Sequence, residues 1–352
     1  MRIHQLETPA AIVDLDALDR NLKTMQEMLG PKGPKLRPHY KSFKCTAIAH
    51  YLAARGVDRF LTAKLSEAED LIASGFEDVL IGNQVTDPQK IARLAYLAGC
   101  CKLTVCVDDA ANIAALEAAC ALAETTLHCL VEFDIGMDRC GVHTEEEFIA
   151  LAKQLDAAPH LVFEGIQAYA GNLAHEFDKE KRAAGSFAVE EKVRHLKATA
   201  EASGLTVPTV SGVSTGTVAF HTCETVYTEV QAGSFLFGDR SYRDVGTAFR
   251  QSLYLLTSVI STRPGTAVFD CGVKSLGMDQ RAPYFAEYPD QAVEFSEEHS
   301  ALYFAHDLCV GDRRRIVPGH CCTTVNLWDK LYLCRGGKVV ACVPVTGRGK
   351  AQ

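Results

Sequence analysis

Residues 103–134 read LTVCVDDAANIAALEAACALAETTLHCLVEFD and contain one complete strand–helix–strand unit. The runs Leu103–Val107 and Cys129–Asp134 have the length and apolar content of buried strands. Between them, apolar residues recur with helical spacing from Ile113 to Leu122, after an aspartate pair at 108–109 that is suited to begin a helix. Strands joined through a helix run parallel, so this stretch predicts a parallel α/β sheet.

The same alternation extends over the first 240 residues. Helical patterns, with further helix starts at Asp87-Pro88 and Thr144, separate eight strand candidates: Ala10–Leu15, Leu36–Lys41, Arg59–Ala63, Val79–Asn83, Leu103–Val107, Cys129–Asp134, Phe163–Tyr169 and Thr209–Ser214. Eight units in about 240 residues are the number and length of a TIM (β/α)8 barrel, which we expect here. A doubly wound open sheet would show the same alternation, so the period alone does not exclude it.

After residue 245 the pattern changes to strands joined by turns, with little helix. The strand candidates there are Leu253–Ile260, Thr266–Phe269, Ala301–Phe304, Arg315–Val317, Lys330–Cys334 and Val339–Val343. We therefore expect two domains. The barrel would comprise residues 8–240, and a mainly β domain would comprise residues 245–352 together with residues 1–7.

Composition excludes several classes of protein. A net charge of −8 gives no electrostatic support for nucleic-acid binding. The sequence shows no signal peptide and no run of about 18 apolar residues, so we expect a cytoplasmic protein without a membrane segment. The 14 cysteines occur in a long chain of that kind, so most are expected to be buried thiols rather than a disulfide framework.

Reactive side chains of a barrel lie at the carboxyl ends of its strands. Lys41 ends one predicted strand, and a partly desolvated lysine amine can form a Schiff base with an aldehyde cofactor. The alternative is a solvated lysine at a strand end. Other predicted strand ends carry Asn83, Asp134 followed by Arg139, and Tyr169.

The segment GVSTGT at residues 212–217 follows the last predicted barrel strand. Ser214, Thr215, Gly216 and Thr217 offer hydroxyls and backbone N–H groups where barrels commonly bind phosphate. Gly233-Ser234 is a second candidate of the same type. The alternative for each is an ordinary polar turn.

His320 and Cys322 lie two residues apart between two predicted strands. Side chains two apart on a strand share a face, so both could bind one metal ion of soft or borderline character. Two protein ligands would leave coordination positions open, as in a catalytic site. The alternative is a buried thiol beside a hydrogen-bonded histidine. The segment Glu297-Glu298-His299 could add acid–base or supporting groups, or form a polar loop.

In their order along the chain these motifs resemble the D-threonine aldolase / D-serine dehydratase family, the metal-assisted branch of the alanine-racemase-like, fold-type-III pyridoxal-phosphate enzymes. The likeness covers nearly the whole length. It rests on TPA (8–10), DLDAL (14–18), LRPHYK (36–41), AKLSEAE (63–69), IGNQ (81–84), DIGMDRCGV (134–142), EGIQAY (164–169), EVQAGS (229–234) and PGHCCTTVNL (318–327).

The resemblance implies a cofactor, a metal and a role for each candidate residue. Pyridoxal 5'-phosphate (PLP) would be carried by Lys41, with Arg139 near its phenolic oxygen, Tyr169 near its ring, and Ser214 to Thr217, Gly233 and Ser234 around its phosphate. His320 and Cys322 would bind a divalent metal, for which zinc is expected and manganese or magnesium are alternatives. A homodimer with the active site near the subunit interface is also implied.

Two positions depart from the family pattern. The family reads Lys-Thr-His-Lys where this chain has Lys41-Ser42-Phe43-Lys44, so a phenylalanine replaces a histidine that could transfer protons. At the metal pair, aldolases of the family present His-x-Asp and dehydratases present His-x-Cys. Cys322 therefore favours a dehydratase and a softer ion such as zinc.

The resemblance thus implies a lyase that acts on a small D-3-hydroxy amino acid. The expected reaction is the β-elimination of water, as in a D-serine dehydratase, giving a 2-oxo acid and ammonia. The close alternative is retro-aldol cleavage to glycine and an aldehyde, as in a D-threonine aldolase. A racemase, which would need no metal pair, and a non-catalytic PLP-binding protein, which would resemble the barrel alone, are remote alternatives.

Overall fold

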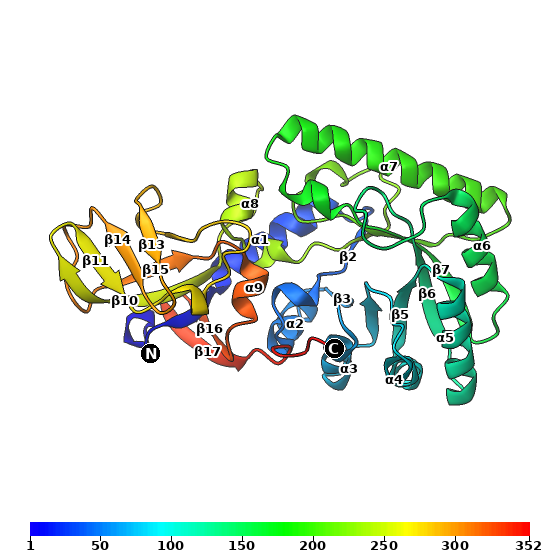
Figure 1. The fold of residues 1–352 in the computed structure, drawn as a ribbon, viewed down its shortest axis with the longest axis horizontal. Coiled ribbons are helices and arrows are strands. Elements are labelled where there is room, and N and C mark those ends of the chain that lie inside the picture. Colours follow the sequence, from blue (N-terminus) through cyan, green and yellow to red (C-terminus); the bar gives the residue numbers. More distant parts are fainter. The chain divides into compact units, whose positions relative to one another are not determined.

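The structure, a computed structural model, describes all 352 residues and divides the chain into two compact units. The first, called the β unit below, comprises Met1–Met25, Ser42–Ala47 and Ser234–Gly349. The second, called the barrel unit, comprises Gln26–Lys41, Ile48–Gly233 and Lys350–Gln352. Figure 1 shows the elements of both units.

The barrel unit is built on a parallel eight-stranded sheet with the order β2-β9-β8-β7-β6-β5-β4-β3. Its strands are β2 (Lys35–Leu36), β3 (Phe60–Thr62), β4 (Asp78–Ile81), β5 (Lys102–Val107), β6 (Leu127–Glu132), β7 (Leu161–Ala168), β8 (Thr209–Gly212) and β9 (Glu229–Val230). A parallel bridge pairs His39 with Leu61, and the Leu61 N–H donates to the Pro38 carbonyl at 3.0 Å, so the first and last strands of the sheet meet. The predicted α/β fold with a TIM-like barrel is confirmed.

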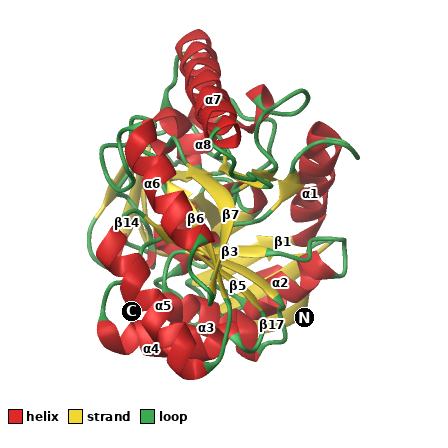
Figure 2. Cartoon of the chain, turned by 90° about the vertical axis from the view of Figure 1, so that its right-hand side faces the viewer, coloured by secondary structure: helices red, strands yellow, loops and turns green.

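Helices alternate with these strands and surround them, as Figure 2 shows for α3 to α6. They are α2 (Thr46–Ala53), α3 (Leu65–Ala73), α4 (Pro88–Ala98), α5 (Ala110–Ala123), α6 (Glu145–Asp156) and α7 (Lys179–Ala202). The three predicted helix starts are confirmed, because the side chains of Asp87, Asp109 and Thr144 accept hydrogen bonds from the free N–H groups of the first turns. Inside the barrel, Leu61, Leu80, Cys106 and Leu130 from four successive strands form an apolar cluster.

The β unit contains a nine-stranded sheet. Its main path is β13-β14-β11-β10-β1-β16-β17, and β15 pairs with both β10 and β12. The strands are β1 (Ala10–Asp14), β10 (Leu253–Arg263), β11 (Thr266–Phe269), β12 (Tyr284–Phe285), β13 (Val293–Phe295), β14 (Ser300–Tyr303), β15 (Arg313–Val317), β16 (Lys330–Arg335) and β17 (Lys338–Pro344). The mainly β character predicted for this part of the chain is confirmed.

Three helices accompany this sheet: α1 (Leu15–Leu29), which continues into the barrel unit, α8 (Arg240–Val245) and α9 (Cys321–Val325). No helix of the protein combines the length and the apolar character that crossing a bilayer requires.

One strand assignment was wrong. The segment predicted as the first barrel strand, Ala10–Leu15, forms β1 of the β unit, where it pairs antiparallel with β10 and parallel with β16. The eighth barrel strand is instead β9, which is only two residues long and was not predicted. A short apolar run predicts a buried strand but does not identify its partners. As a result the boundaries between the two units fall after residues 25, 41, 47, 233 and 349. The sequence had predicted boundaries at residue 8 and at 240–245.

The second strand is also shorter than predicted. Of the candidate Leu36–Lys41, only Leu36 lies in β2. Lys41 lies in the 3-10 turn η2 (Tyr40–Ser42). Pro38 has no N–H to donate to a neighbouring strand, so a regular ladder does not continue through it.

Candidate active site

Lys41 is the last residue of its barrel-unit segment, and the next residue, Ser42, belongs to the β unit. Lys41 is half-buried. Its neighbour Tyr40 is fully buried, and the Tyr40 hydroxyl donates to Asp70 Oδ2 at 2.5 Å. Because Asp70 lies on α3, this bond holds the turn that carries Lys41 against the helix that follows β3.

The predicted phosphate-binding stretch lies between β8 and the 3-10 turn η4 (Val218–Phe220), so it follows the seventh barrel strand rather than the last. Ser214, Thr215 and Thr217 are each 3% exposed. The Ser214 N–H donates to Thr217 Oγ1 at 3.1 Å, and the two hydroxyl oxygens are 3.0 Å apart.

Residue 216 must be glycine, since a Cβ there would lie 2.0 Å from the Ala174 carbonyl oxygen. The stretch is therefore a compact, buried turn lined by hydroxyls, at the start of a helical turn. Such a turn fits an anionic phosphate. Gly233 closes the last large segment of the barrel unit, and Ser234 begins the β-unit segment that follows.

Arg139 and Tyr169 lie in the loops that follow β6 and β7. Asp134 Oδ1 accepts the N–H groups of Gly136 and Met137, both at 2.8 Å, and so shapes the loop that carries Arg139. Burial raises the pKa of Asp134, but these backbone hydrogen bonds outweigh it and hold the pKa below its usual range. The two loops are joined, because Asn172 Nδ2 donates to the Gly136 carbonyl at 3.0 Å.

The structure adds a buried acidic group that sequence reasoning missed. Gln84 Nε2 donates to Glu132 Oε2 at 2.7 Å and to Asp108 Oδ2 at 3.0 Å, and Asp108 Oδ2 also accepts the Gly141 N–H at 2.9 Å. Burial raises the pKa of Glu132. All three polar side chains stand at or just after strand ends, which is the signal that could have identified them.

The metal candidates lie in the β unit, on a helix and not on a strand as predicted. His320 is the N-cap residue of α9, and Cys322 is the second residue of that helix. The buried Asp239 carboxylate accepts the N–H of Cys321, the first residue of α9, at 2.9 Å, and it also caps α8 by accepting the Tyr242 N–H at 3.0 Å. The two side chains lie close enough for Cys322 to raise the pKa of His320.

Two hydroxyl groups of the same unit surround the Cys322 thiol. Cys322 Sγ donates to Ser42 Oγ at 3.3 Å, and it lies 3.4 Å from Ser234 Oγ. Ser42 and Ser234 are the two residues at which the chain enters the β unit from Lys41 and from Gly233.

A carboxylate contacts the histidine from the other side. Asp279 Oδ2 lies 2.7 Å from His320 Nδ1, and Asp279 Oδ1 accepts the Thr323 hydroxyl at 2.7 Å. Burial lowers the pKa of His320, but Cys322 and Asp279 outweigh it and raise the pKa to about 9. Sequence reasoning missed Asp279.

The supporting role considered for Glu297-Glu298-His299 is not borne out by the geometry. These three residues are exposed, and the carboxylates of Glu297 and Glu298 pair with Lys274 at 3.0 and 3.1 Å.

The donor set fits a metal ion of borderline softness. One imidazole and one thiol face each other, and no cluster of three or more His, Cys, Asp or Glu side chains with metal-binding geometry occurs in the protein. A metal held by His320 and Cys322 would therefore keep open coordination positions, as catalytic sites do.

Two sequence families match this chain. The alanine racemase N-terminal domain matches residues 13–241, and the putative serine dehydratase domain matches residues 252–334. The 3-hydroxy-D-aspartate aldolase of Paracoccus denitrificans (strain Pd 1222) is 38% identical over 360 residues, which cover 98% of this chain and 93% of that protein. The D-threo-3-hydroxyaspartate dehydratase of Delftia sp. (strain HT23) is 28% identical over 381 residues, covering 93% and 98%.

A solved structure shows the same likeness in three dimensions. The crystal structure of D-threonine aldolase from Filomicrobium marinum superposes with a TM-score of 0.96 at 36% identity, covering 100% of this chain and 98% of that one. Relatives named as aldolases and one named as a dehydratase thus match nearly the whole chain, with higher identity for the aldolases.

Proposed function

Because the chain belongs to the D-threonine aldolase / D-serine dehydratase family of alanine-racemase-like, PLP-dependent lyases, we propose that it eliminates water from a D-3-hydroxy amino acid. The products would be a 2-oxo acid and ammonia, which are pyruvate and ammonia for D-serine. The observation that carries this proposal is the His320–Cys322 pair, in which a thiol stands where the family's aldolases present a carboxylate.

In this proposal the cofactor residues and the metal residues come from different parts of the chain. The barrel unit holds PLP through Lys41, Arg139, Tyr169, Gly233 and the hydroxyl turn Ser214–Thr217. The β unit supplies Ser234, His320 and Cys322. Ser42, which directly follows Lys41 in the chain, contacts Cys322 Sγ within the β unit.

In this proposal each residue has a distinct role. Bound PLP would supply a sink for the electron pair at the substrate Cα, and a bound metal ion would supply Lewis acidity. Lys41 would hold the cofactor, and its Nζ would act as the base for the Cα proton. His320 and Cys322 would hold the ion. The Ser214–Thr217 turn keeps the phosphate, and with it the ring, in one orientation.

Retro-aldol cleavage is the second candidate, favoured by the higher identity to aldolases. That reaction needs a base that takes the β-hydroxyl proton. Phe43, in place of the family's histidine, cannot take a proton, and its side chain is fully buried in the β unit. This position therefore supports dehydration.

Product analysis tests the proposal. The PLP- and zinc-loaded protein is given D-serine, D-threonine and D-3-hydroxyaspartate, and 2-oxo acid and glycine are measured in parallel. We expect 2-oxo acid with little glycine, and no product from Lys41→Ala. Borohydride reduction followed by peptide mapping should label Lys41. Glycine plus aldehyde as the main products would instead establish the aldolase.

A single exchange probes the metal pair. Cys322→Asp creates the His-x-Asp pattern of the family's aldolases, so we expect the ratio of glycine to 2-oxo acid to rise about tenfold or more, a change of about 1.4 kcal/mol between the two barriers. The control is Cys342→Asp, an exposed cysteine of the same unit, which should leave the ratio unchanged. An unchanged ratio in Cys322→Asp would contradict the assignment of dehydration to Cys322.

The homodimer implied by the resemblance is part of the same proposal. Sedimentation of the loaded protein would show a mass of twice 38.3 kDa if it is right.

A further inference from the structure

The carboxylate of Asp279 has no place in the reaction proposed above, yet it lies within hydrogen-bond distance of His320. We propose that Asp279 is the positioning residue of the metal pair: it fixes the His320 ring so that Nε2, and not Nδ1, binds the ion. The inference rests on the proposed metal pair and assigns to it a residue that lies 41 positions earlier in the chain.

The first support is the geometry at the ring. Asp279 Oδ2 is 2.7 Å from Nδ1, so this nitrogen is occupied by the carboxylate. An imidazole that binds a metal is neutral and carries one N–H, and a carboxylate acceptor places that proton on Nδ1. Nε2 then keeps its lone pair for a metal. A carboxylate behind a ligating histidine also strengthens the nitrogen as a donor.

The second support is that Asp279 is itself held in place. Its other oxygen, Oδ1, accepts the hydroxyl of Thr323, which lies on α9 one residue after Cys322. The carboxylate therefore bridges the N-cap of α9 and its first turn. The two contacts orient the carboxylate along the same short helix that carries both metal candidates.

The third support is the backbone on which Asp279 lies. The Gly277 N–H donates to Thr324 Oγ1 at 2.8 Å, and the His320 N–H donates to the Gly277 carbonyl at 3.3 Å. A Cβ at residue 277 would lie 2.0 Å from Thr323 Oγ1, so only glycine lets the loop approach α9 this closely. The indole Nε1 of Trp328 donates to the Ser275 carbonyl at 3.0 Å, which also holds this loop in place.

Exposure indicates which property Asp279 controls. The His320 side chain is only 16% exposed, whereas that of Asp279 is 50% exposed. A half-exposed carboxylate that anchors a largely buried ring contributes little to the core. Its loss should therefore change the binding of the ion more than the stability of the fold.

The test measures zinc affinity directly, by competition with a chromogenic chelator at fixed pH, on the PLP-loaded full chain. The variants are Asp279→Ala, which removes both contacts, and Asp279→Asn, which keeps the size but not the charge. Asp329→Ala is the matched control, because it removes an exposed, ion-paired aspartate of the same unit without touching His320.

We expect both Asp279 variants to bind zinc roughly 10- to 100-fold more weakly than the wild type, and Asp329→Ala to bind it normally. Thermal unfolding and the absorbance of bound PLP should stay as in the wild type, and excess zinc should restore turnover. If Asp279→Ala fails to fold, Asp279→Asn still allows the test.

Two negative results have different meanings. If the wild type binds zinc and both Asp279 variants bind it within twofold of the wild type, the role of Asp279 is overturned while the metal pair stands. If the wild type binds no zinc, manganese or magnesium, the metal pair itself is wrong and the inference falls with it.

Discussion

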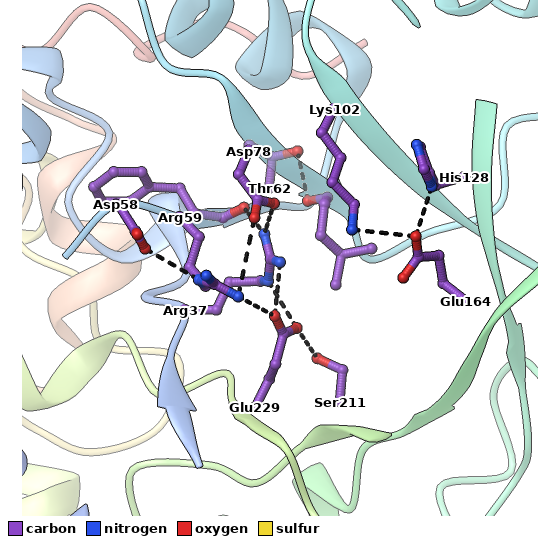
Figure 3. A network of polar contacts seen from close by, with 12 residues as sticks. Arg37, Asp58, Arg59, Thr62, Asp78, Lys102, His128, Glu164, Ser211 and Glu229 are labelled. Carbon is purple, nitrogen blue, oxygen red and sulfur yellow. Dashed lines mark hydrogen bonds and ion pairs between the residues drawn. The ribbon is translucent and has the colours of Figure 1, made fainter. Parts of the chain in front are cut away.

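Arg37 joins three strands of the barrel through two carboxylates (Figure 3). Its Nε and Nη2 donate to the two oxygens of Glu229 at 2.8 and 2.7 Å, and its Nη1 donates to Asp78 Oδ1 at 2.7 Å. Arg37 and Glu229 are each 5% exposed. Asp78 begins β4 and Glu229 begins β9. The guanidinium of Arg37, just after β2, therefore connects strands on either side of the point where the sheet closes.

Removing Arg37 alone should therefore be costly. We expect Arg37→Met to lower the free energy of unfolding by about 3–5 kcal/mol, because Glu229 would remain buried with the partly exposed Arg59, at 3.2 Å, and the neutral Ser211 hydroxyl as its partners. The double variant Arg37→Met/Glu229→Met should recover part of the loss. Urea-induced unfolding followed by circular dichroism measures both. A double variant no more stable than the single one would contradict this account.

Three neighbouring strands share a second charged group (Figure 3). Glu164 on β7 lies 2.6 Å from His128 Nδ1 on β6 and 3.1 Å from Lys102 Nζ on β5. The hydrogen bond from His128, opposed by burial and aided by Lys102, lowers the pKa of Glu164 to about 2. The charged carboxylate thus links three neighbouring strands of the barrel electrostatically.

This contact predicts a pH dependence of stability. A carboxyl whose pKa is lower in the folded state stabilises the fold above its unfolded pKa of about 4.3, and the contribution is lost as the pH falls toward 2. We expect Glu164→Gln to cost about 1–3 kcal/mol at pH 6 and less at each step below pH 4.5. The exposed Glu191→Gln serves as control, with no such trend. A pH-independent difference between Glu164→Gln and the wild type would refute the assignment.

At the scale of the whole molecule, the residues proposed for the cofactor and those proposed for the metal lie mainly in different units. Lys41, Arg139, Tyr169 and the Ser214–Thr217 turn belong to the barrel unit, whereas His320 and Cys322 belong to the β unit. We therefore expect that the metal ion can be removed without loss of the cofactor.

Dialysis against a chelator tests this independence. We expect turnover to fall by at least about 100-fold, since hydroxide is a poor leaving group without a Lewis acid, while the visible absorbance of bound PLP persists. Added zinc should restore activity. Turnover that survives complete metal removal, verified by elemental analysis, would exclude the proposed role of His320 and Cys322.

The sequence by itself determined the alternation of strands and helices, the change to β structure after residue 245, and the residue types that the site needs. Each of these is a local pattern: the period of apolar residues, an N-cap aspartate, or a motif of a few neighbouring residues. That is why the helix starts at Asp87, Asp109 and Thr144 could be predicted.

Only the tertiary structure decided which strands pair and which distant side chains meet. Ala10–Asp14 pairs in the β unit, and Glu229–Val230 takes the eighth place in the barrel, because pairing depends on partners roughly 200 residues away, which no local period encodes. Asp279 reaches His320 for the same reason: a loop approaches α9 through Gly277, and the contact exists only once the β unit has folded.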